Sequence, residues 1–210
     1  MWQQLPQIAK MTAEHLQLAL MGVMYGLLVG VPLGVLISRY RKLVDPVIWL
    51  SNSLQTVPAL ALIGYVMIFT GLTRTTGIIV LFLYSLMPII RATYTGIISV
   101  DSGMIEAARG MGMTRWQILR MIQLPLALSV ILVGIRVATV IAIGTASIMS
   151  LAGAGGLGRM IFAGIDRVQD KMILAGALPA ALLAVAAELG IGALERRFTP
   201  RGMRAAALNR

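Results

Sequence analysis

Residues 16–37 read LQLALMGVMYGLLVGVPLGVLI and contain no charged side chain. A helix of about 20 apolar residues is long enough to cross the hydrocarbon core of a bilayer. Four further apolar runs of similar length follow, at residues 47–70, 76–98, 126–149 and 172–194. Because backbone groups in lipid must be paired within their own segment, we expect each run to form an uninterrupted helix. The sequence therefore predicts an all-α, polytopic membrane protein with five transmembrane helices.

The composition agrees with a membrane location and narrows the possible chemistry. Of the 210 residues, 58% are hydrophobic and only 12% are charged, whereas soluble proteins carry about 25% charged residues. The chain has no cysteine, which excludes disulfides, thiolate metal sites and cysteine nucleophiles. It also has no linker and no low-complexity tract, so we expect residues 1–210 to form a single transmembrane domain.

The net charge of +10 would suit a nucleic-acid partner in a soluble protein, but its distribution favours another explanation. Twelve basic residues fall on one side of the predicted topology: Arg39, Arg41, Lys42, Arg91, Arg109, Arg115, Arg120, Arg196, Arg197, Arg201, Arg204 and Arg210. Five fall on the other side: Lys10, Arg74, Arg159, Arg167 and Lys171. Lys and Arg collect in cytoplasmic loops of membrane proteins. This bias predicts an outside N-terminus, a cytoplasmic C-terminus and no nucleic-acid partner.

The first run also carries a pattern of small residues. Its glycines recur at a strict spacing of four, at Gly22, Gly26, Gly30 and Gly34. This spacing places them on one face of a helix, where a neighbouring helix can approach closely. Prolines lie inside several runs, at Pro32, Pro58, Pro88 and Pro179. Fixed curvature and hinges of a moving pathway both predict such prolines.

A polar segment at residues 99–125 interrupts this apolar chain. Asp101 and Ser102 are favourable N-cap residues, and Gly110 and Gly112 offer left-handed helix ends. Thr114 with Gln117 forms a capping-box pattern. The segment therefore predicts a short helix at 102–109, a glycine turn and a second helix from 115 to 125. Periodicity alone favours an ordinary amphipathic connector lying on the membrane surface.

The spacing of letters in this segment is more specific than its periodicity. Glu106-Ala107-Ala108 is followed by Gly112, Ile122 and Leu124-Pro125. This pattern resembles the EAA loop of ABC importer permeases. SLQTVPALAL (53–62), GIRVATVIAIGTASI (134–148), GAGGLG (153–158) and TPRG (199–202) resemble permeases for osmoprotectants: glycine betaine, choline, carnitine and proline betaine. The resemblance assigns coupling to an ATPase to Glu106, Ala107, Ala108, Arg109, Gly110, Gly112 and Arg115.

The resemblance also implies an assembly in the bacterial cytoplasmic membrane. Two ATP-binding subunits would carry ATP and Mg²⁺, a second permease subunit would complete the pathway, and an extracytoplasmic binding protein would deliver the solute. This chain itself would hold no cofactor or metal and catalyse no reaction. A methionine or other amino-acid importer is the alternative within the family. An autonomous secondary transporter or channel is the alternative from another class, although the sequence shows no internal repeat.

GAGGLG at 153–158 satisfies the letters of a dinucleotide-binding motif, but its context does not fit. That motif needs a strand before it and a helix after it in a soluble unit. We expect instead a compact extracytoplasmic turn or outer gate. Contact with a binding protein and a merely solvated loop both fit the residues that follow. The candidate residues for this role are Gly155, Gly156, Asp166, Arg167 and Asp170.

Polar residues within the runs are the remaining candidates. Translocation-pathway lining and structural hydrogen bonding both fit the set Ser51, Asn52, Gln55, Pro58 and Arg136. Glu188 is expected to neutralise an intramembrane arginine, with Arg91 closer in depth than Arg136. His15, the only histidine, is expected at the membrane interface, since one His makes no metal site.

Overall fold

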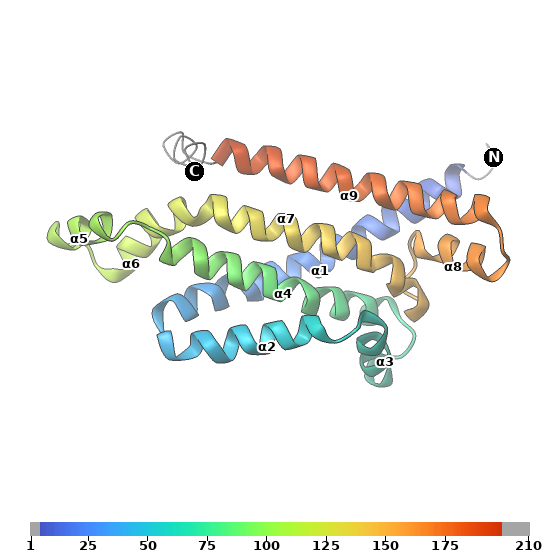
Figure 1. The fold of residues 1–210 in the computed structure, drawn as a ribbon, viewed down its shortest axis with the longest axis horizontal. Coiled ribbons are helices and arrows are strands. Elements are labelled where there is room, and N and C mark those ends of the chain that lie inside the picture. Colours follow the sequence, from blue (N-terminus) through green and yellow to red (C-terminus); the bar gives the residue numbers. More distant parts are fainter. Residues whose placement is uncertain (1–4, 199–210) are drawn as a thin grey trace.

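The computed structural model describes residues 5–198, and every regular element within this range is a helix (Figure 1). The helices are α1 (Leu5–Arg39), α2 (Val44–Thr56), α3 (Ala59–Thr70), α4 (Arg74–Ile98), α5 (Ser102–Gly110), α6 (Arg115–Ile118), α7 (Leu124–Met149), α8 (Gly158–Asp166) and α9 (Asp170–Phe198). Short turns of 3-10 or π helix join some of them: η2 (Arg41–Leu43), η3 (Leu119–Gln123) and η4 (Ser150–Ala152). The predicted all-α class is confirmed for this part of the chain.

Four helical segments are each long and apolar enough to cross a bilayer, and the pair α2–α3 would make a fifth span. This pair is bent by 99°, so the expectation of an uninterrupted second helix is wrong. The break lies at Val57 and Pro58, where ψ is 125° and 137° respectively. Proline lacks an N–H and forces the preceding residue into an extended conformation, which ends α2. Pro32, Pro88 and Pro179, in contrast, lie inside continuous helices.

The glycine stripe of α1 is the face on which α4 packs. A Cβ atom added at any of the four glycines would lie 1.9–2.9 Å from an α4 side chain. The facing residues are Leu81, Ser85, Ile89 and Thr93, in the order of Gly22, Gly26, Gly30 and Gly34. Glycine therefore sets how closely these two helices approach, as expected for small residues between membrane helices.

α4 is the central helix and α9 the peripheral one. α4 contacts α1, α2, α3 and α7, and about half of its residues are buried. On its α7 side, a Cβ added at Gly134 would lie 2.3 Å from Ala92 Cβ. α9 packs mainly on α7 and α8 and buries only Gly176 and Gly192. One face of α9, which includes Leu183 and Ala187, packs against the core, whereas Leu178, Leu182 and Leu189 are exposed, as suits a helix facing lipid or another membrane helix.

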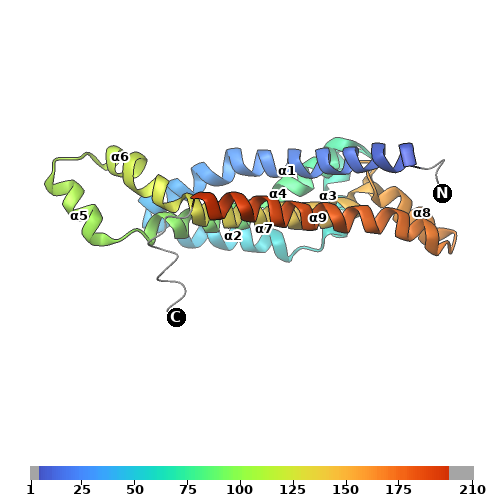
Figure 2. The ribbon, with the colours of Figure 1, turned by 90° about the horizontal axis from the view of Figure 1, so that it is seen from above.

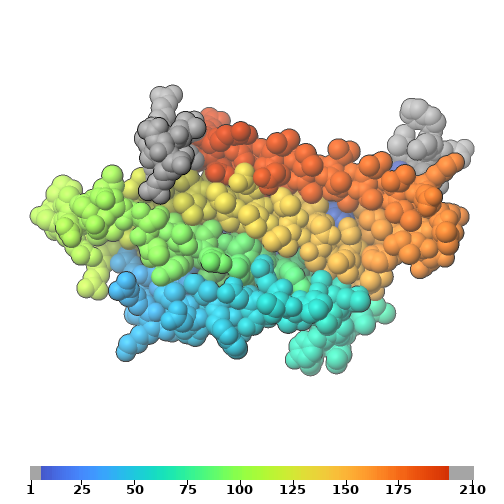
Figure 3. Space-filling view, viewed as in Figure 1, coloured from blue at the N-terminus to red at the C-terminus, as the bar shows by residue number. Residues whose placement is uncertain are grey.

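The elements sort to two opposite ends of an elongated bundle (Figures 1 and 2). One end, the α5 end, holds α5, α6, η2 and the last residues of α1 and α9; the region of α5 projects beyond the bundle there (Figure 3). The other end, the α8 end, holds α8 and the first residues of α1. The tail basic residues Arg201, Arg204 and Arg210 and the segment TPRG lie outside the described residues.

Candidate functional site

The predicted EAA segment begins with a capped helix. The Asp101 carboxylate accepts a hydrogen bond from the Met104 backbone N–H at 3.1 Å, which starts α5. Such a cap satisfies one of the free N–H groups of a helix start. Within α5, Glu106, Ala107 and Arg109 are exposed, whereas Ala108 is fully buried against its own chain. The exposed face of α5 is therefore the part that another protein can contact.

A glycine turn ends α5, and only one of the two predicted glycines takes the left-handed conformation. Gly112 has φ +80°, whereas Gly110 is the last helical residue. The Gly112 N–H donates to Arg109 O at 2.9 Å, and the Met113 N–H donates to Ala108 O at 3.1 Å. These bonds pair carbonyls that the helix end leaves free. Nothing lies within 4 Å of the position of a Gly112 Cβ, so its glycine is required by conformation rather than by space.

The predicted capping box at Thr114 and Gln117 is present. The Gln117 N–H donates to Thr114 Oγ1 at 3.3 Å, and the Thr114 N–H donates to Gln117 Oε1 at 2.7 Å. From Arg115 the chain continues through α6, the π turn η3 and α7, and Pro125 lies in the first turn of α7. Residues Arg115–Ala152 thus form one continuous helical segment of 38 residues. The glycine turn is directly connected to a span that crosses the bundle.

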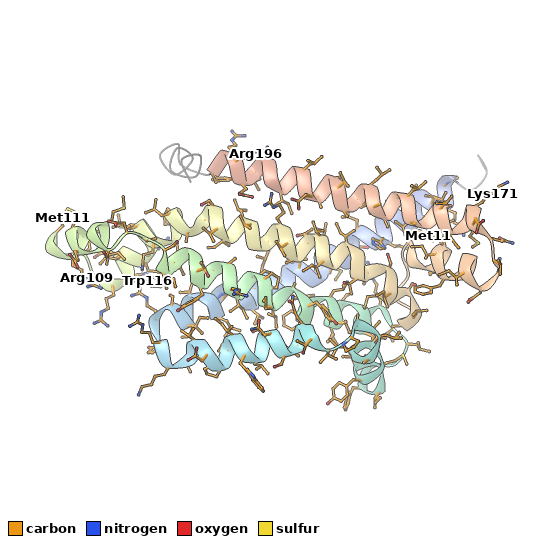
Figure 4. All side chains as sticks on the ribbon, in the orientation of Figure 1. Met11, Arg109, Met111, Trp116, Lys171 and Arg196 are labelled. Carbon is orange, nitrogen blue, oxygen red and sulfur yellow. The ribbon has the colours of Figure 1, made fainter. Side chains whose placement is uncertain are left out.

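The loop is also attached to the end of α1. The Arg39 guanidinium donates through Nη2 to Arg115 O at 2.6 Å. Beside this contact lies a polar cavity of about 220 Å³ between α1 and the loop. Figure 4 shows Arg109 and Trp116 at this end of the molecule, opposite Met11 and Lys171. The cavity is lined by Ser38, Arg39, Ile105, Arg109, Arg115, Ile118 and Gln123.

The polar residues of α2 are held mostly by backbone hydrogen bonds. Ser51 is buried and donates to Val47 O, while Gln55 Nε2 donates to Tyr84 O in α4 at 3.0 Å. The Tyr84 hydroxyl in turn donates to Val57 O, at the break before Pro58. Asn52 has a buried Oδ1 with no hydrogen-bond partner among the described residues. Gln55 and Tyr84 therefore join α2 to α4. Among the polar residues of α2, Asn52 is the one whose side-chain oxygen has no hydrogen-bond donor among the described residues.

Arg136 forms the intramembrane ion pairs, which corrects the expected pairing of Glu188 with Arg91. Arg136 Nη1 lies 3.4 Å from Glu188 Oε1 and 3.5 Å from Glu195 Oε2. A Cβ at Gly192 would lie 3.1 Å from Arg136 Nη1, so glycine makes room for the guanidinium. Arg91 is exposed and forms no salt bridge within residues 5–198. Arg91 and Glu188 lie at similar distances from the inner ends of their predicted spans, which favoured their pairing. The pairing is instead decided by the helix face from which each side chain projects.

The GAGGLG segment forms a compact turn packed on α1. Gly153, Gly155 and Gly156 all have positive φ, between +74° and +86°. The Gly156 N–H donates to Glu14 Oε2 at 3.4 Å. Beyond the turn, Asp166, Arg167 and Asp170 are exposed at the connection between α8 and α9. The structure thus separates two glycines held by α1 from three charged residues that face away.

His15 is fully buried within the protein and is not exposed at the membrane interface. Its Nε2 donates to Ile143 O in α7 at 2.9 Å, and its ring lies against Gly156. The sequence around His15 is polar, but the close approach of a glycine turn more than 140 residues away encloses it. No cluster of three or more His, Asp or Glu side chains within the described residues could hold a metal ion.

Comparison with known families accounts for this architecture. The family model described as a binding-protein-dependent transport system inner membrane component matches residues 22–200. The chain belongs to this family. It is therefore a transmembrane subunit of an ABC importer, and the prediction made from the EAA pattern is confirmed. Permeases of this family work with an ATPase and a substrate-binding protein.

Characterised relatives cover most of the chain. The glycine betaine/carnitine/choline transport system permease protein OpuCD of Bacillus subtilis is 51% identical over 188 residues, covering 89% of this chain and 82% of the relative. The choline transport system permease protein OpuBD of the same organism is 49% identical, covering 89% and 83%. The osmoprotectant import permease protein OsmW of Salmonella typhimurium is 41% identical over 202 residues, covering 94% of each chain. The predicted resemblance to osmoprotectant permeases is confirmed.

Solved structures show the same fold at low sequence identity. A chain of the MetNI methionine ABC transporter, in an inward facing conformation, superposes with a TM-score of 0.81 at 22% identity, covering 92% of this chain and 96% of that one. A chain of an amino acid ABC transporter superposes with a TM-score of 0.72 at 23% identity, covering 94% and 95%. The same helix arrangement therefore occurs in chains of low sequence identity.

Proposed function

We propose that the chain forms the translocation pathway of an ATP-driven importer for quaternary-ammonium osmoprotectants such as glycine betaine, choline or carnitine. The observation that carries this proposal is the 41–51% identity to three permeases named for these solutes, over about nine-tenths of the chain. The methionine alternative has weaker support, because the MetNI chain shares the fold at only 22% identity. Membership of a binding-protein-dependent family also argues against an autonomous secondary transporter.

Coupling would take place on the exposed face of α5. An ATPase subunit that binds α5 through Glu106 and Ala107 would move α5 together with the continuous helix that begins at Arg115. ATP and Mg²⁺ would be bound by two such subunits, and this chain would hold no cofactor of its own. The α5 end would face the cytoplasm, with the N-terminus outside, because basic residues concentrate at that end.

At the α8 end, the binding protein would meet Asp166, Arg167 and Asp170, while Gly155 and Gly156 would shape the outer gate. A second permease subunit, the same chain or a related one, would complete the pathway. Trimethylammonium groups are recognised by aromatic cages, and only 6% of this chain is aromatic. Selectivity would therefore lie mainly in the binding protein, and the chain would act as a gated conduit.

The test is uptake of labelled glycine betaine, with methionine as the comparison solute, in cells that lack their own importers. The cells would carry this chain with its neighbouring operon genes. We expect betaine uptake, and we expect Gly112→Val to reduce it at least tenfold, because a β-branched residue does not tolerate φ near +80°. Gly190→Val is the matched control, since a Cβ there also meets open space but lies in regular helix.

The outcomes separate the two parts of the proposal. Methionine uptake without betaine uptake would overturn the substrate class and leave the family intact. Betaine uptake that survives Gly112→Val at full rate, with the protein at normal abundance, would overturn coupling through the α5 turn.

A further inference from the structure

An apolar groove of about 560 Å³ runs along α1 beside the EAA loop. One wall is the last turns of α1, and the other is formed by α6, η3 and the start of α7. Two arginines, Arg39 and Arg115, close the groove at the α5 end. All other lining side chains are apolar or aromatic: Val31, Pro32, Val35, Leu36, Trp116, Leu119 and Leu124.

The polar cavity described above adjoins this groove. Arg39 and Arg115 line both spaces, and Arg109 lines the polar cavity alone. Three exposed arginines thus line a cavity of about 220 Å³ that no carboxylate lines. The guanidinium groups of Arg109 and Arg115 form no hydrogen bond or ion pair with the rest of the described chain, and Arg39 uses one N–H on Arg115 O. Each guanidinium has five donors, so most of this donor capacity is open to an anion.

The dimensions of the groove match one leaflet of a bilayer. Arg39 follows Val31 by eight positions in α1, which corresponds to about 12 Å at 1.5 Å per residue. Half of the hydrocarbon core is about 15 Å thick. With the α5 end at the membrane surface, the apolar part of the groove would lie at acyl-chain depth and its arginines at the level of the phosphates. Trp116 is 64% exposed beside them, at the depth where aromatic residues concentrate in membrane proteins.

We propose that the two spaces form one binding site for an anionic phospholipid. The phosphate would lie among Arg39, Arg109 and Arg115, and one acyl chain would occupy the apolar groove. An extended peptide in the same groove would leave its backbone N–H and C=O groups unpaired, whereas an acyl chain has none to satisfy. An anionic lipid offsets the three like charges better than a zwitterionic one, whose net charge is zero. The assignment to the cytoplasmic leaflet rests on the proposed orientation; the binding itself does not.

Trp116 provides a direct reporter for this site. The full chain with Trp2→Phe and Trp49→Phe would be reconstituted in dioleoylphosphatidylcholine vesicles. Dibrominated phosphatidylglycerol or dibrominated phosphatidylcholine would then be added in increasing fraction, and quenching of Trp116 fluorescence would give their relative association. We expect phosphatidylglycerol to associate about fivefold more strongly than phosphatidylcholine, the preference that one additional charge contact gives near a membrane surface.

Matched variants separate the site from general surface charge. Arg39→Gln with Arg115→Gln should reduce the preference to about one, whereas Arg41→Gln with Lys42→Gln should retain it. Both pairs remove two positive charges at the same end, but Arg41 and Lys42 line neither space. Arg109→Gln, which changes the polar cavity alone and leaves the Arg39 bond to the loop intact, should give an intermediate preference.

Four results would overturn the proposal. The first is equal quenching by the two lipids in the chain that carries only Trp2→Phe and Trp49→Phe. The second is an equal loss of preference in both double variants, which would indicate surface potential only. The third is loss of the preference on adding soluble glycerol phosphate, which would indicate a free-anion site. The fourth is loss on adding the purified ATPase subunit, which would assign the pocket to a protein partner. None of these results depends on which solute the importer carries.

Discussion

The loops at the two ends of the bundle both depend on glycines with positive φ, but for different reasons. At the α5 end, a Cβ on Gly112 would meet nothing within 4 Å, and the loop is shaped by its own caps at Asp101 and Thr114. At the α8 end, a Cβ on Gly156 would lie 3.1 Å from His15 Nδ1. The first loop holds its shape mainly by local hydrogen bonds, whereas the second is shaped by the bundle beneath it. The local hydrogen bonds of the α5-end loop suit a segment that moves as a unit. The packing of the α8-end loop on the bundle suits a segment that stays in place.

The largest effect is expected where the α8-end loop is packed most tightly, at Gly158. A Cβ there would lie 1.9 Å from Ser147 O, which is backbone and cannot rotate away. Gly158→Ala should lower the free energy of unfolding by about 3 kcal/mol. Equilibrium unfolding in detergent micelles measures this loss. Gly144→Ala is the control, because a Cβ at Gly144 meets open space; equal stability of the two variants would remove the contrast between the ends.

His15→Ala tests whether α1 supports the same loop from below. The change removes a fully buried ring and its hydrogen bond to Ile143 O, so we expect a loss of about 2 kcal/mol in the same measurement. Amide exchange should also become faster at residues 153–158 and remain unchanged in α5. Met24→Ala, an exposed position on the same helix, should leave both quantities unchanged. Faster exchange at both ends would show that the two loops are not independent.

Arg136 tests how α9 is held toward the α5 end. Arg136→Leu should lower the free energy of unfolding by about 1 kcal/mol, a modest value because all three side chains are partly exposed. Adding Glu188→Gln should restore part of this loss, since it removes a carboxylate left without its cation. Arg91→Leu should stay within about 0.5 kcal/mol of the parent chain. Strictly additive losses for Arg136 and Glu188 would contradict the pairing.

The smallest expected effect belongs to the cap of α5. Asp101→Ala should destabilise this short helix by about 1 kcal/mol, because it removes the bond to the Met104 N–H. Amide exchange in α5 should become about fivefold faster, while the midpoint of global unfolding stays unchanged. Ser102→Ala, at the adjacent position, should alter neither quantity. A shift of the global midpoint would mean that the α5 end is as firmly integrated as the α8 end.

The features that the sequence predicted well are those controlled by neighbouring residues. Asp101, Thr114 and Gly112 act within a few positions of themselves, so their caps and turn followed from residue type and spacing. The face formed by Gly22 and its three successors is likewise a property of one helix. Hydropathy also located the membrane-spanning runs, because the apolar character of a run depends only on its own residues.

The features that the sequence predicted poorly depend on distant packing. Pro58 and Pro88 are the same residue in similarly apolar runs, yet Pro58 separates two helices while Pro88 lies buried inside the continuous α4. The carbonyl of Pro88 lies against Gly134, a contact that only the fold reveals. Arg136 could have been found earlier, because Glu188, Gly192 and Glu195 share one helix face at spacings of four and three. The burial of His15 left no comparable signal.

The helical segment from Arg115 to Ala152 connects the two ends of the molecule. Its 38 residues correspond to about 57 Å at 1.5 Å per residue, which is longer than the bilayer core is thick. One end follows the glycine turn of α5, and the other leads into the GAGGLG turn. Tilting such a rod by about 5° about one end displaces the other by about 5 Å. A small rotation at one end of this segment therefore becomes a displacement of several ångströms at the other.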